Sequence, residues 1–273
     1  SPEGTVFEAM TGLSALHNMK TYRGASGELD VDCIVEGLNN LKDKINLRPN
    51  IELKISTESK KGTDLGLTKT GLESLEHFSD FTMEHDEIAW ITETGVNFCA
   101  QAFPTVGYDH PDSPVLAVLG KVLHNGYLHS AIREKGGAYG SGAMQDVNAG
   151  LFKFFSYRDP NIEETFNSFN ASIEWAVNSI TENHLEQGIL GIISSIDKPA
   201  SPSSEAMADL YANLSGRTFE KRKNFRNSVI QCTVEKLIEV TKKYLMARPR
   251  RALVSGRKFE NQLTSMGFTI RDV

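Results

Sequence analysis

The sequence predicts an α+β protein in which helices pack on one face of a mostly antiparallel sheet. Two patterns predict this class: strand-like segments in hairpin order fill the middle of the chain, and successive helices with apolar stripes follow them. The composition agrees. Of 273 residues, 40% are hydrophobic and 23% are charged, which is ordinary for a soluble globular protein with a sizeable core.

The first 57 residues predict two helices and a strand. Residues 10–22 place Met10, Leu13, Leu16 and Met19 near one helical face. Residues 31–47 repeat apolar side chains at a spacing of three and four, with Asp30 as a suitable N-cap and Pro49 as the stop. Residues 51–57 alternate as a strand does.

The middle of the chain predicts a strand, one long helix and a hairpin. Residues 96–102 alternate apolar and polar side chains. The helix is expected over residues 114–136, with Ser113 as N-cap, Pro114 in the first helical position and Gly136 as a left-handed C-cap. The hairpin is expected to pair residues 138–145 with 151–157.

The last part of the chain is mainly helical, with apolar stripes or capping residues that mark each helix. Helices are expected over residues 161–180, 181–197 with Thr181 as cap, 201–216, and 233–246 with Thr233 as cap. A short strand at 251–256 follows. The opening order of helices and a strand resembles this ending, so we expect two related units. Residues 1–85 form the C-terminal part of one α/β domain plus a linker, and residues 86–273 form a complete one.

Composition also excludes several function classes. The net charge of −6 argues against nucleic-acid binding, and no apolar run reaches the roughly 18 residues of a membrane span. The N-terminus lacks the pattern of a secretory signal. The three cysteines are far apart and form no CxxC pair, which favours buried thiols in a reducing, intracellular compartment.

A glycine-rich stretch, REKGGAYGSGA at 133–143, raises a specific chemical hypothesis. A turn through Gly136 and Gly137 would bring Arg133, at the helix end, close to Tyr139, at the start of the next strand. A guanidinium and a phenol are donors suited to a carbonyl oxygen that gains negative charge. The alternative is a surface Arg–carboxylate pair and a tyrosine at the core edge, and spacing alone favours that alternative.

The sequence gives less support to nucleotide binding, metal binding or serine hydrolase chemistry. The glycines precede a strand and lack a following Lys-Ser or Lys-Thr, so neither a P-loop nor a dinucleotide fingerprint fits. His124 and His129 are five residues apart and should diverge on a helix, and no complete metal site is expected in this chain. The Gly-x-Ser-x-Gly motif of serine hydrolases is absent.

At REKGGAYG the sequence resembles the zinc metallopeptidases of the insulinase/pitrilysin class. The likeness continues through GLFKFFSYRDPN, NIEETFNSF and IDKPASPSSEAM, and these segments resemble the presequence-protease branch. It covers residues from about 88 to 245. The resemblance implies four related α/β domains in two halves that close around an unstructured peptide. Zinc is held by an inverted His-x-x-Glu-His motif in the N-terminal half, a motif that this chain lacks.

The resemblance therefore implies that this chain is the C-terminal, substrate-binding half of such an enzyme, or most of it. Residues 1–85 would be the C-terminal part of the third domain plus a linker, and residues 86–273 the fourth domain. Its partners would be the N-terminal zinc-carrying half and a peptide substrate. Arg133 and Tyr139 would orient the substrate and stabilise the transition state. Gly136 and Gly137 would belong to the substrate-binding site and hold the two side chains together. The chain alone is expected to bind no zinc and to be inactive. A bacterial cytoplasm or a mitochondrial matrix would suit it.

Two alternatives stay open. Relatives of this fold also serve as non-catalytic scaffold or partner subunits, although a scaffold has no need of an Arg–Tyr pair. An inverted zinc motif upstream in the same reading frame would favour the enzyme. A nucleotide-binding protein would be stabilised by ATP or NAD, and we expect no such effect.

Overall fold

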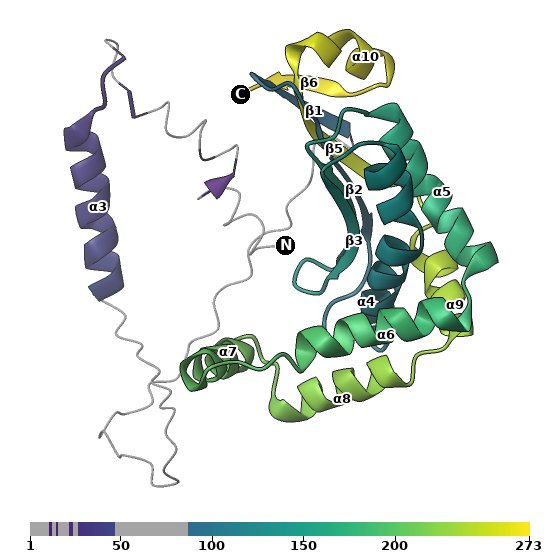
Figure 1. Ribbon diagram of the computed structural model, residues 1–273. Coiled ribbons are helices and arrows are strands. Elements are labelled where there is room, and N and C mark those ends of the chain that lie inside the picture. Colours follow the sequence, from purple (N-terminus) through teal and green to yellow (C-terminus); the bar gives the residue numbers. More distant parts are fainter. Residues whose placement is uncertain (1–10, 13–14, 16–21, 24–26, 47–86) are drawn as a thin grey trace, which may run out of the picture. The chain divides into compact units, whose positions relative to one another are not determined.

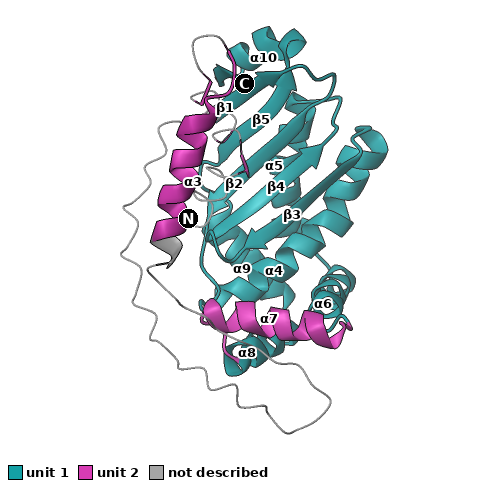
Figure 2. Ribbon diagram, turned by 90° about the vertical axis from the view of Figure 1, so that its left-hand side faces the viewer, with its two compact units in different colours: residues 1, 81–198, 219–273 teal, residues 2–80, 199–218 magenta. Residues whose placement is uncertain are grey.

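The computed structural model describes residues 11–12, 15, 22–23, 27–46 and 87–273 (Figure 1). The helix expected at 10–22, for the most part, and the strand expected at 51–57 lie outside the described residues. The chain forms two compact units. The described part of one unit comprises 87–198 and 219–273, and the other unit includes 27–46 and 199–218 (Figure 2).

The second unit contributes two described helices, α3 (Val31–Asn46) and α7 (Pro202–Leu214). The Asp30 carboxylate accepts the backbone N–H of Cys33 at 3.0 Å, which confirms the predicted N-cap of α3. Ser201 caps α7 in the same manner, with Pro202 opening the helix. The predicted domain limits at residues 85 and 86, and the relation of residues 1–85 to a third domain, stay predictions.

The first unit is built on a six-stranded open sheet with the strand order β3-β4-β2-β5-β1-β6. Its strands are β1 (Glu87–Thr92), β2 (Phe98–Pro104), β3 (Gly140–Asp146), β4 (Leu151–Tyr157), β5 (Arg250–Gly256) and β6 (Thr269–Asp272). The pairs β3/β4, β4/β2 and β2/β5 are antiparallel, and β1 pairs in parallel with β5 and β6. The predicted hairpin and fold class are confirmed.

Within this unit the helices gather on one face of the sheet, as predicted (Figures 1 and 2). They are α4 (Asp112–Leu123), α5 (Glu163–Ser179), α6 (Glu182–Ile196), α8 (Phe219–Ile230) and α9 (Val234–Tyr244), with the short α10 (Glu260–Ser265) near the C-terminus. Aromatic side chains fill the layer between the helices and the sheet. Phe154 of β4 is fully buried and contacts Phe103 of β2 and Phe169 of α5, with ring centroids 6.1 and 5.5 Å apart.

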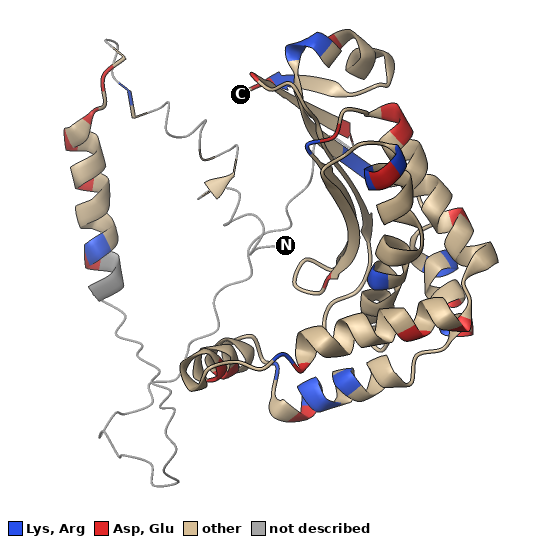
Figure 3. Cartoon of the chain, in the orientation of Figure 1, with Lys and Arg blue, Asp and Glu red and all other residues tan. Residues whose placement is uncertain are grey.

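Caps set the limits of the later helices. Thr181 forms a capping box with His184 at the start of α6, and the Thr233 hydroxyl accepts the N–H of Lys236 at the start of α9, so both predicted caps are confirmed. The basic residues of α8, where the ribbon in Figure 3 is coloured blue, include Lys221 and Arg226. They pair with Asp109 and Asp197 at 2.8 and 2.6 Å. Exposed pairs of this kind contribute little to stability.

The helix expected over 114–136 differs from the prediction in two respects. It begins two residues earlier, at Asp112, whose backbone N–H is bound by the His110 side chain, so Ser113 is a buried helical residue and not the cap. Its second half is a π-helix, His124–Lys135 (η1 hereafter). A π-helix closes its hydrogen bonds between residues five apart, so each turn holds more residues than an α-turn.

Candidate functional site

Arg133 lies in the last turn of η1, where a cation interacts favourably with the helix dipole. Its side chain is exposed. Among the residues that the structure describes, its guanidinium forms no ion pair and no hydrogen bond, whereas the nearby Glu134 carboxylate lies 3.5 Å from His129 Nδ1. The described part of the chain therefore gives no support to the alternative that Arg133 belongs to a surface pair.

Two glycines reverse the chain after Arg133. The prediction that Gly136 adopts the left-handed conformation is wrong: its φ is −79°, and Gly137 is the left-handed residue, with φ +79°. Gly137 N–H donates to Arg133 O at 3.1 Å, and Ala138 N–H donates to Ile132 O at 3.1 Å. Gly136 is required for a different reason, since a Cβ there would lie 2.6 Å from the backbone oxygen of Ile132.

Tyr139 lies two residues after Gly137 and directly precedes β3. Its side chain is 61% exposed, so it is not a tyrosine of the core edge. Its ring meets the ring of Tyr157 edge to face, with centroids 5.6 Å apart, and the Arg158 guanidinium lies 5.6 Å from its centroid. Its backbone N–H donates to Arg158 O at 3.3 Å. Its hydroxyl makes no hydrogen bond among the described residues.

The structure thus places Arg133 and Tyr139 on the two sides of one tight turn, both exposed. No hydrogen bond joins the two described side chains, so their common use on one substrate group stays a prediction. The two glycines set the direction in which the chain leaves the helix.

Residues just after β4 support this turn, and the sequence reasoning assigned them no role. Asn161 Nδ2 donates to Gly136 O at 2.6 Å. The fully buried Asp159 carboxylate accepts the Asn161 N–H at 2.9 Å and the Thr165 hydroxyl at 2.8 Å. No clear signal in the sequence marked this role, because Asp, Pro and Asn after a strand are the ordinary residues of a turn.

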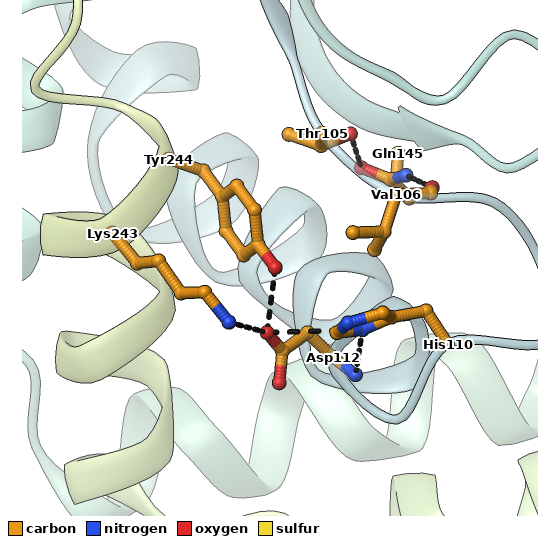
Figure 4. Close-up of polar contacts among 7 residues, drawn as sticks. All are labelled: Thr105, Val106, His110, Asp112, Gln145, Lys243 and Tyr244. Atoms are coloured by element: carbon orange, nitrogen blue, oxygen red, sulfur yellow. Dashed lines mark hydrogen bonds and ion pairs between the residues drawn. The ribbon is translucent and has the colours of Figure 1, made fainter.

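A second polar cluster joins the start of α4 to the end of α9 (Figure 4). One oxygen of the Asp112 carboxylate accepts hydrogen bonds from Lys243 Nζ and the Tyr244 hydroxyl, both at 2.7 Å, and His110 Nδ1 lies 3.8 Å away. Partial burial by itself would raise the pKa of Asp112, but these hydrogen bonds and the charges of Lys243 and His110 outweigh it and lower the pKa. These contacts join α4 to α9, so the cluster stabilises the packing of the two helices.

The histidine pair of η1 contradicts the prediction that His124 and His129 diverge. Their ring centroids lie 6.1 Å apart, edge to face, because residues five apart fall on one side of a π-helix. In the part of the chain that the structure describes, no three His, Cys, Asp or Glu side chains gather so that they could hold a metal ion. Whether the whole chain binds zinc stays a prediction.

The two buried cysteines, Cys99 and Cys232, do not offer a nucleophile. Burial, with the Asp159 charge, raises the pKa of Cys99 to about 12, and burial raises that of Cys232 to about 11. Neither thiol forms appreciable thiolate at neutral pH, and thiolate is the reactive species. Cys33 is exposed and belongs to the other compact unit. No described helix has the length and apolar character that a membrane crossing requires.

A family model described as the PreP C-terminal domain matches residues 88–246, which is more than half of the chain. The chain belongs to the PreP C-terminal domain family. The predicted resemblance to the presequence-protease branch is confirmed. The matched range contains Arg133, Gly136, Gly137 and Tyr139, although the match assigns these residues no role.

Curated relatives of this PreP C-terminal domain carry the name mitochondrial presequence protease. The zebrafish protein is 33% identical over 208 residues, covering 76% of this chain and 19% of the relative. The Yarrowia lipolytica protein is 41% identical over 152 residues, covering 55% of this chain and 15% of the relative. The chain thus spans less than a fifth of either relative.

Solved structures share the fold at lower identity. A protease from Helicobacter pylori is 18% identical with a TM-score of 0.55, covering 68% of this chain and 48% of that one. The inactive peptidase domain of a putative zinc protease from Bordetella parapertussis is 16% identical with a TM-score of 0.51, covering 60% and 92%. At these identities the likeness establishes the fold of the PreP C-terminal domain and nothing finer.

Proposed function

We propose that this chain is the C-terminal, substrate-binding part of a zinc-dependent metalloendopeptidase that degrades short unstructured peptides. Membership in the PreP C-terminal domain family and the protease names of its relatives support the proposal. The zinc is expected in an N-terminal half of the same protein, where it would supply an activated water. The mitochondrial names of the relatives favour a mitochondrial matrix over a bacterial cytoplasm.

The contribution of this chain is a pair of donors. The Arg133 guanidinium and the Tyr139 hydroxyl hydrogen-bond the carbonyl oxygen of the peptide bond that is cleaved. That oxygen gains negative charge in the transition state, so donors fixed in advance stabilise the transition state more than the bound substrate. Arg133 adds two parallel N–H groups in a planar fork, which also orient the peptide.

One observation carries this assignment: Arg133 and Tyr139 flank a two-glycine turn, and both side chains are exposed without an ion pair or hydrogen bond among the described residues. Donor groups that satisfy one another, or that bond to neighbouring carboxylates, would have no free capacity for a substrate. The same observation speaks against a purely structural role as a scaffold subunit.

The test is peptide cleavage by the full-length protein that carries this chain, with a quenched fluorescent peptide. Arg133→Lys and Tyr139→Phe should each reduce kcat by about 10²–10³, the loss typical of one oxyanion donor. Arg248→Lys and Tyr211→Phe are matched controls, since these side chains are 75% and 63% exposed and lie outside the turn. Wild-type turnover in both site variants would refute the proposal.

A second assay tests whether this chain cleaves peptides without the N-terminal half. The 273-residue chain by itself should leave the peptide intact, with and without added zinc. Adding the separately produced N-terminal half should restore cleavage. Cleavage by the pure chain would show that the chemistry does not depend on the other half.

A further inference from the structure

Arg158 has a backbone conformation that a non-glycine residue rarely adopts. Its φ is +50°, and it is the one non-glycine residue with a positive φ among the described residues. This left-handed region disfavours residues with a Cβ, and such strain tends to collect at functional sites. A glycine in this position would carry no strain. The arginine side chain therefore needs an explanation of its own.

The structure around Arg158 fixes this conformation. Before it, β4 ends at Tyr157, and after it, the backbone of Asp159 exchanges hydrogen bonds with that of Asn97 in both directions, at 2.8 and 2.9 Å. Asn97 is fully buried, and its side chain bonds to Asp159 O and to the Ser255 hydroxyl. Arg158 is thus held between a strand and a buried polar network, and its own carbonyl receives the N–H of Tyr139.

The Arg158 side chain lies against Tyr139. The guanidinium carbon is 5.6 Å from the centroid of the tyrosine ring, within the range of a cation–π contact. Several other arginines of the chain pair with carboxylates, among them Arg226 with Asp197 and Arg251 with Glu87. The Arg158 guanidinium is exposed and forms no ion pair among the described residues.

Tyr139 needs such a contact if it is to act as a donor. Its side chain is 61% exposed, and its hydroxyl has no described hydrogen-bond partner, so only contacts to the ring hold its direction. Two ring contacts exist: the edge of Tyr157 and the guanidinium of Arg158. A freely rotating phenol would lose conformational entropy each time it met the substrate oxygen.

We propose that Arg158 is a positioning residue that holds the Tyr139 ring in the direction in which its hydroxyl meets the substrate carbonyl. The proposal rests on the donor role given to Tyr139 above. Arg158 contacts Tyr139 at two points. Its carbonyl oxygen accepts the backbone N–H of Tyr139, and its guanidinium lies over the tyrosine ring. The strained backbone of Arg158 is what directs that guanidinium toward Tyr139.

The test again uses peptide cleavage by the full-length protein. Arg158→Gly keeps the left-handed backbone and removes the guanidinium, so it should fold normally and lower kcat about two- to tenfold, with little change in KM. Arg158→Lys keeps a cation and should recover part of the loss. Thermal unfolding of each variant separates a loss of stability from a loss of positioning.

A double-mutant cycle with Tyr139→Phe decides whether Arg158 acts through the phenol. In the phenylalanine background, Arg158→Gly should cause no further loss. Wild-type kcat in Arg158→Gly would overturn the proposal, and so would a loss that is equally large in both backgrounds. A raised KM with unchanged kcat would assign Arg158 to direct substrate binding and overturn it as well. If Tyr139→Phe itself is fully active, the donor role of Tyr139 fails instead.

Discussion

His124 and His129 lie edge to face on one side of the π-helix η1, with their ring centroids 6.1 Å apart. Nδ1 of His124 is buried and has no hydrogen-bond partner in the described part of the chain. Burial lowers the pKa of His124, and the nearby charges of His129 and Lys121 lower it further. The folded protein therefore favours neutral His124.

This pair predicts a pH dependence of stability. Because the pKa of His124 is lower in the folded state, the unfolded chain binds more protons as the pH falls below about 6.5, and the free energy of unfolding decreases. His124 stops lowering the free energy of unfolding once the pH is below its pKa in the folded protein. Urea denaturation between pH 8 and 5 should show a smaller decrease for His124→Gln than for the wild type. His129→Gln should have an intermediate effect, and an unchanged slope in His124→Gln would contradict the prediction.

A side chain at position 126 should collide with a neighbouring helix. The indole of Trp175 occupies the space that a Cβ at position 126 would take. Alanine favours a helix over glycine by about 1 kcal/mol, but overpacking costs about 1–3 kcal/mol, so Gly126→Ala should destabilise the protein. Tryptophan fluorescence and urea denaturation should both report it. With Trp175→Phe already present, Gly126→Ala should become neutral or stabilising, and destabilisation of equal size in both backgrounds would refute the explanation.

The glycine turn predicts different tolerances at its two positions. Gly136→Ala brings a Cβ to within 2.6 Å of Ile132 O, a backbone atom that cannot move away without disturbing η1. Gly137→Asn should be tolerated, because asparagine adopts the left-handed conformation and the space beside Gly137 is open to 3.7 Å. Peptide cleavage by the full-length protein should therefore fall at least about tenfold in Gly136→Ala and stay near wild type in Gly137→Asn. The reverse order would contradict the role of the turn.

The contacts of the Asp112 carboxylate should stabilise the folded protein at neutral pH, and protonation of the carboxylate in acid should remove this contribution. Asp112→Asn should lower the free energy of unfolding at pH 7 by about 1 kcal/mol, a value reduced because the carboxylate is partly exposed. The folded pKa of Asp112 is lowered, so the contribution is present above the unfolded pKa of about 3.9 and is lost as the pH falls through the folded pKa. The two proteins should therefore begin to converge in thermal stability once the pH falls below about 3.9. Asp109→Asn, which breaks an exposed pair with Lys221, is the control and should have almost no effect.

The sequence by itself determined the class of the fold, several helix caps and the hairpin that follows the glycine turn. The caps Asp30, Thr181 and Thr233 and the hairpin from β3 to β4 follow from local periodicity and from side chains that bond to the nearest backbone groups. The turn between Arg133 and Tyr139 could also be predicted, because two adjacent glycines mark a local turn. Glycine is needed in a turn wherever a Cβ would collide or φ is positive.

Only the tertiary structure decided which distant residues meet. The expected α-helix continues as the π-helix η1, and Trp175 of another helix packs on Gly126 within it. The local pattern at 124–135 predicted neither feature. The same holds for Arg158 against Tyr139, which depends on a strand end fixed by the buried Asn97 and Asp159. Hydrogen bonds within a turn are encoded by neighbours in the chain, whereas these contacts exist only once the sheet and helices have packed.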